Sequence, residues 1–210
     1  MRARNRRNQK GNSLLEFALA STVLTPLFFG TVGIGLNMGR STQTLLLCRD
    51  IAHMYANTVD FSQAASKNVA VQLASGTGMT VNGGNAVIIL SQVITVYQAD
   101  CDAGGYPNGC ANLGKQVIVN RIAIGNTALT SSRYGTPNSN IVTANGNIAQ
   151  NDYLINASAV ATNFSSVLAD GGLTQNQGDI AYLGECYVLT PDTSYLGTNT
   201  SQGVYAKFVF

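Results

Sequence analysis

The chain has 210 residues, enough for one domain of ordinary size and one membrane anchor. Only 10% of its residues are charged, compared with about 25% in a typical soluble domain. Five of the twelve basic residues precede Gly11, which leaves seven basic against ten acidic residues in the rest. Because a nucleic-acid-binding domain carries its basic residues on its folded part, this distribution argues against a nucleic-acid partner.

An apolar segment follows the basic N-terminus. Residues 14–36 include a single charged side chain, Glu16, and a helix of this length spans about 34 Å, more than the roughly 30 Å of a hydrocarbon core. A removable signal peptide is the alternative, but its apolar region is only about 7–15 residues long and ends at the cleavage site. Here the nearby small-residue pattern, Ala18-Leu19-Ala20, precedes most of the apolar run. We therefore expect a basic leader over 1–11 and a transmembrane helix over 12–38, with residues 1–10 in the cytoplasm and everything after Met38 outside.

The junction between the basic leader and the apolar segment resembles a site cut by prepilin peptidases. Gly11 ends the leader, and Glu16 and Phe17 begin the apolar run five and six positions later. Cleavage after Gly11 leaves Asn12 as the new N-terminus, and glycine offers an unhindered scissile position. Glu16, which lipid disfavours, could then pair with the free amine of Asn12 on a neighbouring subunit. The alternative is a linker glycine followed by a glutamate that reaches back to the membrane surface.

A wider set of residues resembles the N-terminal pattern of TadE-like proteins, the minor pseudopilins of the tight-adherence (Flp) pilus. The set is Gly11, Glu16-Phe17-Ala18-Leu19, Pro26, Phe29-Gly30 and Gly39-Arg40. The resemblance covers about the first 60 residues. Major Flp pilins often have Glu-Tyr where this chain has Glu16-Phe17, and type IVa pilins usually begin with phenylalanine where it has Asn12. The resemblance implies an α+β, pilin-like fold without a cofactor. The partners that it implies are the prepilin peptidase, membrane lipid, other pilus or pseudopilus subunits and inner-membrane assembly proteins.

The apolar segment also carries residues that affect helix shape and packing. Pro26 removes a backbone hydrogen bond, so we expect a kink there. Gly30, Gly35 and Gly39 follow, and the last two have the G-x-x-x-G spacing that lets another helix approach closely. The alternative is that these glycines are merely tolerated in a membrane helix.

A helical pattern continues through 39–75, the expected membrane-distal segment. Apolar side chains recur at three- and four-residue steps, and we expect the head to pack on this stripe, which comprises Leu45, Leu47, Cys48, Ile51, Ala52, Met54, Tyr55 and Val59. Asp60 is a candidate cap for a second helix that ends at Gly76. His53, the single histidine, is expected to be a surface or packing residue.

The region 76–210 is expected to form a β-rich extracytoplasmic head. A valine- and isoleucine-rich run predicts a buried strand over 86–97, and further strands are expected over 117–124, 180–189 and 204–210. Residues 125–150, rich in Asn, Ser, Thr and Gly, predict a surface loop, and residues 157–168 a short helix. The expected fold is therefore a long N-terminal helix packed on a small, mainly antiparallel sheet.

Four cysteines lie beyond the anchor, in an expected oxidising compartment. Cys101 and Cys110 flank a turn-rich loop, and we expect them to pair. Cys48 and Cys186 remain, either as a second disulfide or as buried free thiols. Their spacing does not fit a zinc site.

The sequence contains no G-x-S-x-G elbow, Walker A loop or H-E-x-x-H motif, so we expect no enzyme. The leading hypothesis is a minor pilin. Its rival is an uncleaved, signal-anchored envelope protein that binds a ligand or surface polymer through its head. An extracytoplasmic hydrolase would need an active-site cluster that the sequence does not display.

Overall fold

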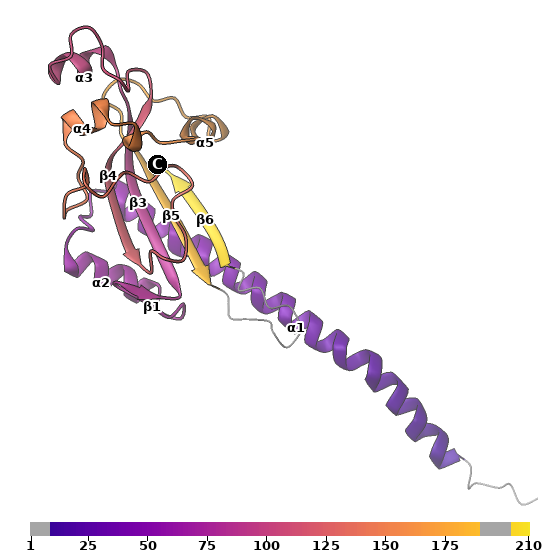
Figure 1. Cartoon of the computed structure of the whole chain (residues 1–210). Coiled ribbons are helices and arrows are strands. Elements are labelled where there is room, and N and C mark those ends of the chain that lie inside the picture. The colour runs from indigo at the N-terminus through magenta and orange to yellow at the C-terminus, as the bar shows by residue number, and fades with distance from the viewer. Residues whose placement is uncertain (1–8, 190–202) are drawn as a thin grey trace, which may run out of the picture.

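The computed structural model of the chain describes residues 9–189 and 203–210. Its first element, helix α1, runs unbroken for 48 residues, Gln9–Ala56. Figure 1 shows its C-terminal part against the head and its N-terminal part projecting far beyond it. The boundary expected at 38/39 therefore lies inside one continuous helix. The kink at Pro26 stays a prediction.

The head combines one antiparallel sheet with short helices. Four strands form the sheet in the order β4-β3-β5-β6, and every neighbouring pair is antiparallel. They are β3 (Ala86–Thr95), β4 (Gln116–Gly125), β5 (Ala181–Leu189) and β6 (Gly203–Val209). The other elements are α2 (Ala64–Leu73), the β1–β2 ribbon (Met79–Thr80 and Gly83–Gly84), α3 (Gln98–Ala103), α4 (Gln150–Ile155), a 3₁₀ turn (Ala157–Ala159) and α5 (Phe164–Asp170). The α+β, pilin-like fold expected from the sequence is confirmed.

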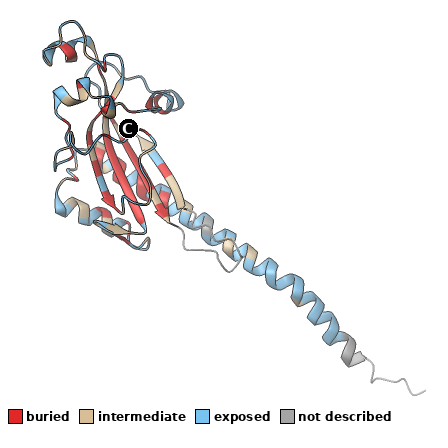
Figure 2. Ribbon diagram, in the orientation of Figure 1, coloured by how far each residue is buried: buried red, intermediate tan, exposed pale blue. Residues whose placement is uncertain are grey.

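One face of the sheet packs against the C-terminal third of α1. The buried side chains of the helix on this face are Leu47, Cys48, Ile51, Ala52 and Tyr55. They join a core that includes Ile88 and Leu90 of β3. Figure 2 shows buried residues concentrated in the strands, whereas the free part of α1 is exposed. The expected apolar stripe is thus largely the packing surface, except that Leu45 is 42% exposed and lies outside the core.

Two disulfides link parts of the head. Cys48 of α1 is bonded to Cys186 of β5, with 5.6 Å between their Cα atoms. Cys101 of α3 is bonded to Cys110 in the loop that leads to β4. The second pair is the one expected from the sequence. For Cys48 and Cys186, which the sequence left open, the structure has the disulfide, and this bond connects the membrane-length helix directly to a central strand.

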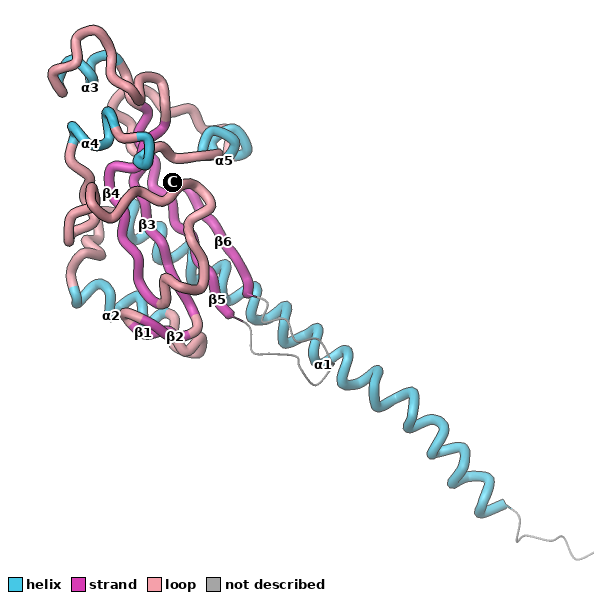
Figure 3. Tube along the Cα trace, viewed as in Figure 1, coloured by secondary structure: helices cyan, strands magenta, loops and turns pink. Residues whose placement is uncertain are grey.

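The opposite face of the sheet is covered by the segment between β4 and α4. Figure 3 shows this loop crossing the sheet on the side away from α1. Tyr134 and Ile148 from the loop are buried against Phe164 and Leu183 in a second core. The surface loop expected over 125–150 is therefore only partly free, since some of its side chains cover the sheet.

Two local expectations were wrong. The helix predicted over 157–168 is divided, because Ala161 donates its N–H to the carbonyl of Gln116 and so joins the edge of β4. α5 starts only after Asn163, whose φ is 58°. Asp60 does not cap α2: its carboxylate accepts the backbone N–H of Ser62 at 2.8 Å in the turn before the helix.

Candidate functional site

The N-terminal part of α1 is an exposed apolar surface. Among the described residues, only Ser13–Ala56 of this helix is long and apolar enough to cross a membrane, and its most apolar window is wholly exposed. Leu14 and Phe17 are 73% and 74% exposed, values that a water-soluble helix rarely tolerates side by side. The structure thus separates α1 into a third that packs on the head and a longer part whose apolar side chains have no partner among the described residues.

The expected processing residues lie in the first turns of this exposed part. Gly11 and Asn12 belong to the helical backbone of α1, which begins at Gln9. Glu16 is exposed, one turn beyond Asn12, and no other charged residue occurs between Gly11 and Arg40. A single carboxylate so close to the end of the helix remains within reach of polar groups outside the bilayer.

The expected helix-packing residues leave open space around α1. A Cβ atom added to Gly30, Gly35 or Gly39 would meet nothing within 4 Å. Packing within the described chain therefore does not require glycine at these positions. The open space is compatible with close packing of a second helix against these glycines. Pro26 lies inside the helix and has no backbone N–H to donate to the carbonyl of Thr22.

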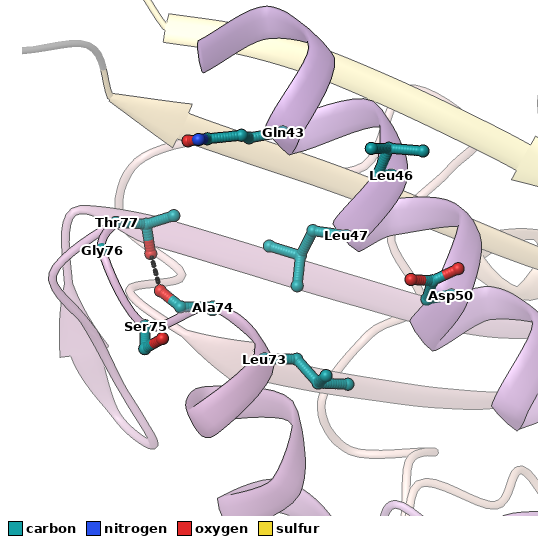
Figure 4. A pocket seen from close by; sticks show the side chains of 9 residues that line it. All are labelled: Gln43, Leu46, Leu47, Asp50, Leu73, Ala74, Ser75, Gly76 and Thr77. Carbon is teal, nitrogen blue, oxygen red and sulfur yellow. Dashed lines mark hydrogen bonds between the residues drawn. The ribbon is translucent and has the colours of Figure 1, made fainter. Parts of the chain in front are cut away.

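A shallow pocket lies where α1 meets the end of α2. Figure 4 shows Leu46 and Leu73 at its sides and Leu47 on its floor, with Asp50 at one end. Its volume is about 370 Å³, and Gln43 and the segment 74–77 complete the lining. Leu46 is 53% and Leu73 49% exposed, so the pocket is mainly an apolar surface.

The most polar arrangement in the head surrounds Glu185, which is 2% exposed. Its carboxylate accepts hydrogen bonds from the hydroxyl of Ser132, the backbone N–H of Arg133 and the hydroxyl of Tyr205. The guanidinium of Arg133 stacks on the ring of Tyr205, 3.8 Å from its centroid. This cluster fastens the loop to the sheet. The sequence does not reveal this cluster, because Glu185 lies in an otherwise apolar strand and its partners are distant in the chain. Ser132 and Arg133 are 53 and 52 residues away, and Tyr205 is 20 residues away.

Two tyrosines of the head should titrate abnormally. Burial raises the pKa of Tyr55, whose hydroxyl donates to Asn120 at 2.7 Å. Burial, together with the hydrogen bond to Glu185, raises the pKa of Tyr205. Since unfolded tyrosines ionise near pH 10, the folded head binds more protons than the unfolded chain above that pH. The stabilisation is therefore complete below about pH 10 and is lost as the pH rises further.

We expect Tyr205→Phe to flatten this alkaline loss of stability by up to about 1.4 kcal/mol per pH unit. Thermal unfolding from about pH 8 to about pH 11 measures it. Burial lowers the pKa of Arg121 to about 10, so Arg121 makes the protein more stable as the pH rises above that value. Arg121 is present in both proteins, so the difference between their pH profiles reports Tyr205. An identical pH profile for both proteins would contradict the expectation.

The described residues contain no group of three His, Cys, Asp or Glu side chains placed to hold a metal ion. His53 is exposed, and its ring lies 5.5 Å from that of Phe210, so it has the surface and packing role expected of it.

A long apolar N-terminal helix that projects from an antiparallel sheet, to which its C-terminal end is packed, is a pilin-like architecture. Comparison with protein-family models, with curated proteins and with solved structures found no match to the chain.

Proposed function

We propose that this protein is a minor pilin or pseudopilin that takes part in assembly of a tight-adherence (Flp-type) pilus and is cut by a prepilin peptidase after Gly11. It resides in the bacterial inner membrane with its leader in the cytoplasm and its head outside. Its partners are the peptidase, other pilus or pseudopilus subunits, inner-membrane assembly proteins and membrane lipid. It performs no reaction of its own.

The observation that carries this proposal is the division of α1. The exposed part, which contains Glu16, is long enough to lie in a membrane or among other apolar helices. The buried part, from Leu47 to Tyr55, fixes the head rigidly to that helix. A subunit that is drawn out of a membrane into a filament needs such a connection, because the apolar half must exchange lipid for neighbouring subunits while the head stays folded.

Three further observations support the proposal. The charge distribution changes at Gly11, which separates a basic leader from an acidic remainder. The two disulfides suit an oxidising compartment outside the cytoplasm. The glycines that follow Pro26 have free space around them, as an interface between helices requires.

Processing tests the proposal directly. We expect the membrane-extracted protein to start at Asn12 when a prepilin peptidase is present and at its original N-terminus when the peptidase is absent. Gly11→Val should abolish cleavage, because a branched side chain at the scissile position hinders the peptidase. Gly35→Val introduces the same change in the same helix, far from the cut, and should be processed normally. N-terminal sequencing and intact mass are measured for all four samples: the wild type with and without the peptidase, and the two variants with it.

An uncut start in the native host would contradict the proposal. It would favour an uncleaved, signal-anchored envelope protein that binds its ligand through the head. Normal cleavage of Gly11→Val would show that the cut lies elsewhere in the leader, which would equally contradict the assignment of Gly11 and Asn12.

A further inference from the structure

The outer edge of β6 has free backbone groups. Tyr182 and Phe210 exchange both backbone hydrogen bonds, at 2.9 and 3.0 Å. Since hydrogen-bonded and non-bonded pairs alternate along an antiparallel ladder, the N–H and C=O groups of Tyr205, Lys207 and Val209 point away from β5. No described residue bonds to them, so this edge is a ready template for another strand.

The opposite edge of the same sheet is occupied by the chain itself. Segments that follow β4 return to its outer side and pair with it. The pairs are Ala161 N–H with Gln116 C=O, Ile148 N–H with Val119 C=O, and Arg121 N–H with Gly146 C=O, at 2.8, 2.9 and 2.7 Å. Among the described residues, the sheet can therefore grow only at β6.

The direction of β6 is defined relative to α1. Val204, at the start of the strand, lines a hollow together with Ile34 and Met38 of the helix. At its other end, Phe210 packs on His53. β6 therefore starts beside the exposed apolar part of α1 and runs parallel to the helix, as Figure 1 shows.

This direction limits what can occupy the edge. Here the argument rests on the proposed function, in which α1 holds every copy in the same orientation across the membrane. Two copies related by an axis along the membrane normal have parallel β6 strands, whereas a symmetric pairing of two edges requires antiparallel ones. β6 of one copy and β4 of the next would be antiparallel and could pair, but the outer edge of β4 is already bonded to the chain itself. A second copy is thus excluded as the partner, whether it offers its β6 or its β4.

We propose that the edge of β6 binds an extended segment of a different envelope protein, which adds to the sheet as a fifth strand. The surface defines the chemistry of that segment. Lys207 is exposed and is the one charged residue of β6, so it calls for a carboxylate on the same face of the partner. On the α1 side, Val204 and Phe208 are only half-buried and call for apolar residues. The partner strand therefore alternates apolar and polar residues, with an acidic one beside Lys207.

Hydrogen–deuterium exchange of the full chain tests this binding. The protein is extracted from its native membrane in mild detergent with its partners retained, and a second sample is stripped of them. The amides of Tyr205, Lys207 and Val209 should exchange at least about tenfold more slowly in the first sample. Exchange at equal rates would overturn the proposal.

A pair of variants at one position separates backbone pairing from charge. Lys207→Pro removes an N–H group that the β5 ladder does not use, and proline is tolerated at such edge positions. Lys207→Ala removes only the charge. We expect Lys207→Pro to lose the complex and Lys207→Ala to keep it with weaker affinity. Retention of the complex by Lys207→Pro would overturn the proposal. If this variant does not fold, the hydrogen–deuterium exchange of the wild-type protein provides the test.

The identity of the neighbour is read from a photo-cross-link placed at position 207. An adduct of two copies of this chain would overturn the proposal, whereas an adduct with a different chain, together with the protected amides, supports it. The N-terminus of the same sample is sequenced in parallel. A start at Asn12 with an unprotected edge refutes the β6 partner alone, whereas an uncut leader refutes the proposed function instead.

Discussion

Replacement of Cys48 and Cys186 by serine is expected to lower the free energy of unfolding of the head by about 5 kcal/mol in the chain-entropy account of disulfides. The bond joins residues 138 positions apart, and the entropy that it removes from the unfolded chain grows with loop length. Since natural domains are stable by only about 5–15 kcal/mol, the loss brings the head close to unfolding. Urea denaturation of the full chain in detergent micelles measures it.

The second disulfide provides the matched control. Cys101 and Cys110 are separated by only 9 positions, so their replacement by serine should cost about 2.5–3 kcal/mol. This pair also lies at the far end of the head, away from α1. A larger loss from the short loop than from the helix-to-strand bond would contradict the expectation.

In the proposed pilin, the position of Cys48 lets the long-range disulfide transmit force from the membrane helix to the head. Its sulfur lies on the buried face of α1, and the Cys186 residue to which it is bonded is in a strand flanked on both sides by others. Force applied along the exposed part of the helix therefore reaches the sheet through a covalent bond as well as through apolar packing. We expect the serine variant to be processed at Gly11 normally, because the cut lies far from the head.

Much of the fold was predictable because local sequence and final structure agree. The strands β3 and β4 coincide with runs rich in valine and isoleucine, and β5 and β6 with runs that mix valine with aromatic residues. The expected bounds differ from the observed ones by at most two residues. The continuous apolar run likewise predicted the exposed part of α1. At these places tertiary contacts reinforce the local preference.

The errors arose where a distant segment determines the local structure. Residues 157–168 were expected to be helical, but pairing with Val117 at the edge of β4 holds Val160 in an extended conformation. The loop after β4 looks soluble, yet Tyr134 is 6% exposed because the sheet needs a cover on its second face. Glu185 was missed for the same reason, since its hydrogen-bond donors come from Ser132, Arg133 and Tyr205.

Part of the candidate site was accessible from the sequence, and part was not. Gly11, Glu16 and Pro26 could be singled out from the sequence because they belong to a linear pattern, and their roles stay predictions. The free space around Gly30, Gly35 and Gly39 and the open edge of β6 required the structure, because they depend on which surfaces the rest of the chain leaves uncovered. Gly184 is the clearest example of such a position. In the sequence it is one glycine in a predicted strand, and in the structure it determines how closely α1 approaches the sheet.

A Cβ atom on Gly184 would lie 2.5 Å from the Cβ of Ala52, closer than such atoms are found in proteins. Gly184→Ala should therefore force α1 away from β5 and cost about 1–3 kcal/mol of stability, as overpacked cores do. Ala52→Gly alone should cost about 1 kcal/mol, because glycine weakens a helix. Urea denaturation of both variants in detergent micelles measures these losses.

The double variant decides whether the close approach is the cause. In Ala52→Gly/Gly184→Ala the methyl group is moved from the helix to the strand, and the new Cβ lies 3.4 Å from the Cα of residue 52, a much easier contact. We expect the double variant to be no less stable than Ala52→Gly alone, which is a favourable coupling of about 1–3 kcal/mol. Additive losses of stability would show that glycine is needed at position 184 for the conformation of the strand backbone and not for the close contact with α1. The coupling would instead establish that the distance between the membrane-length helix and the head depends on this pair of small residues.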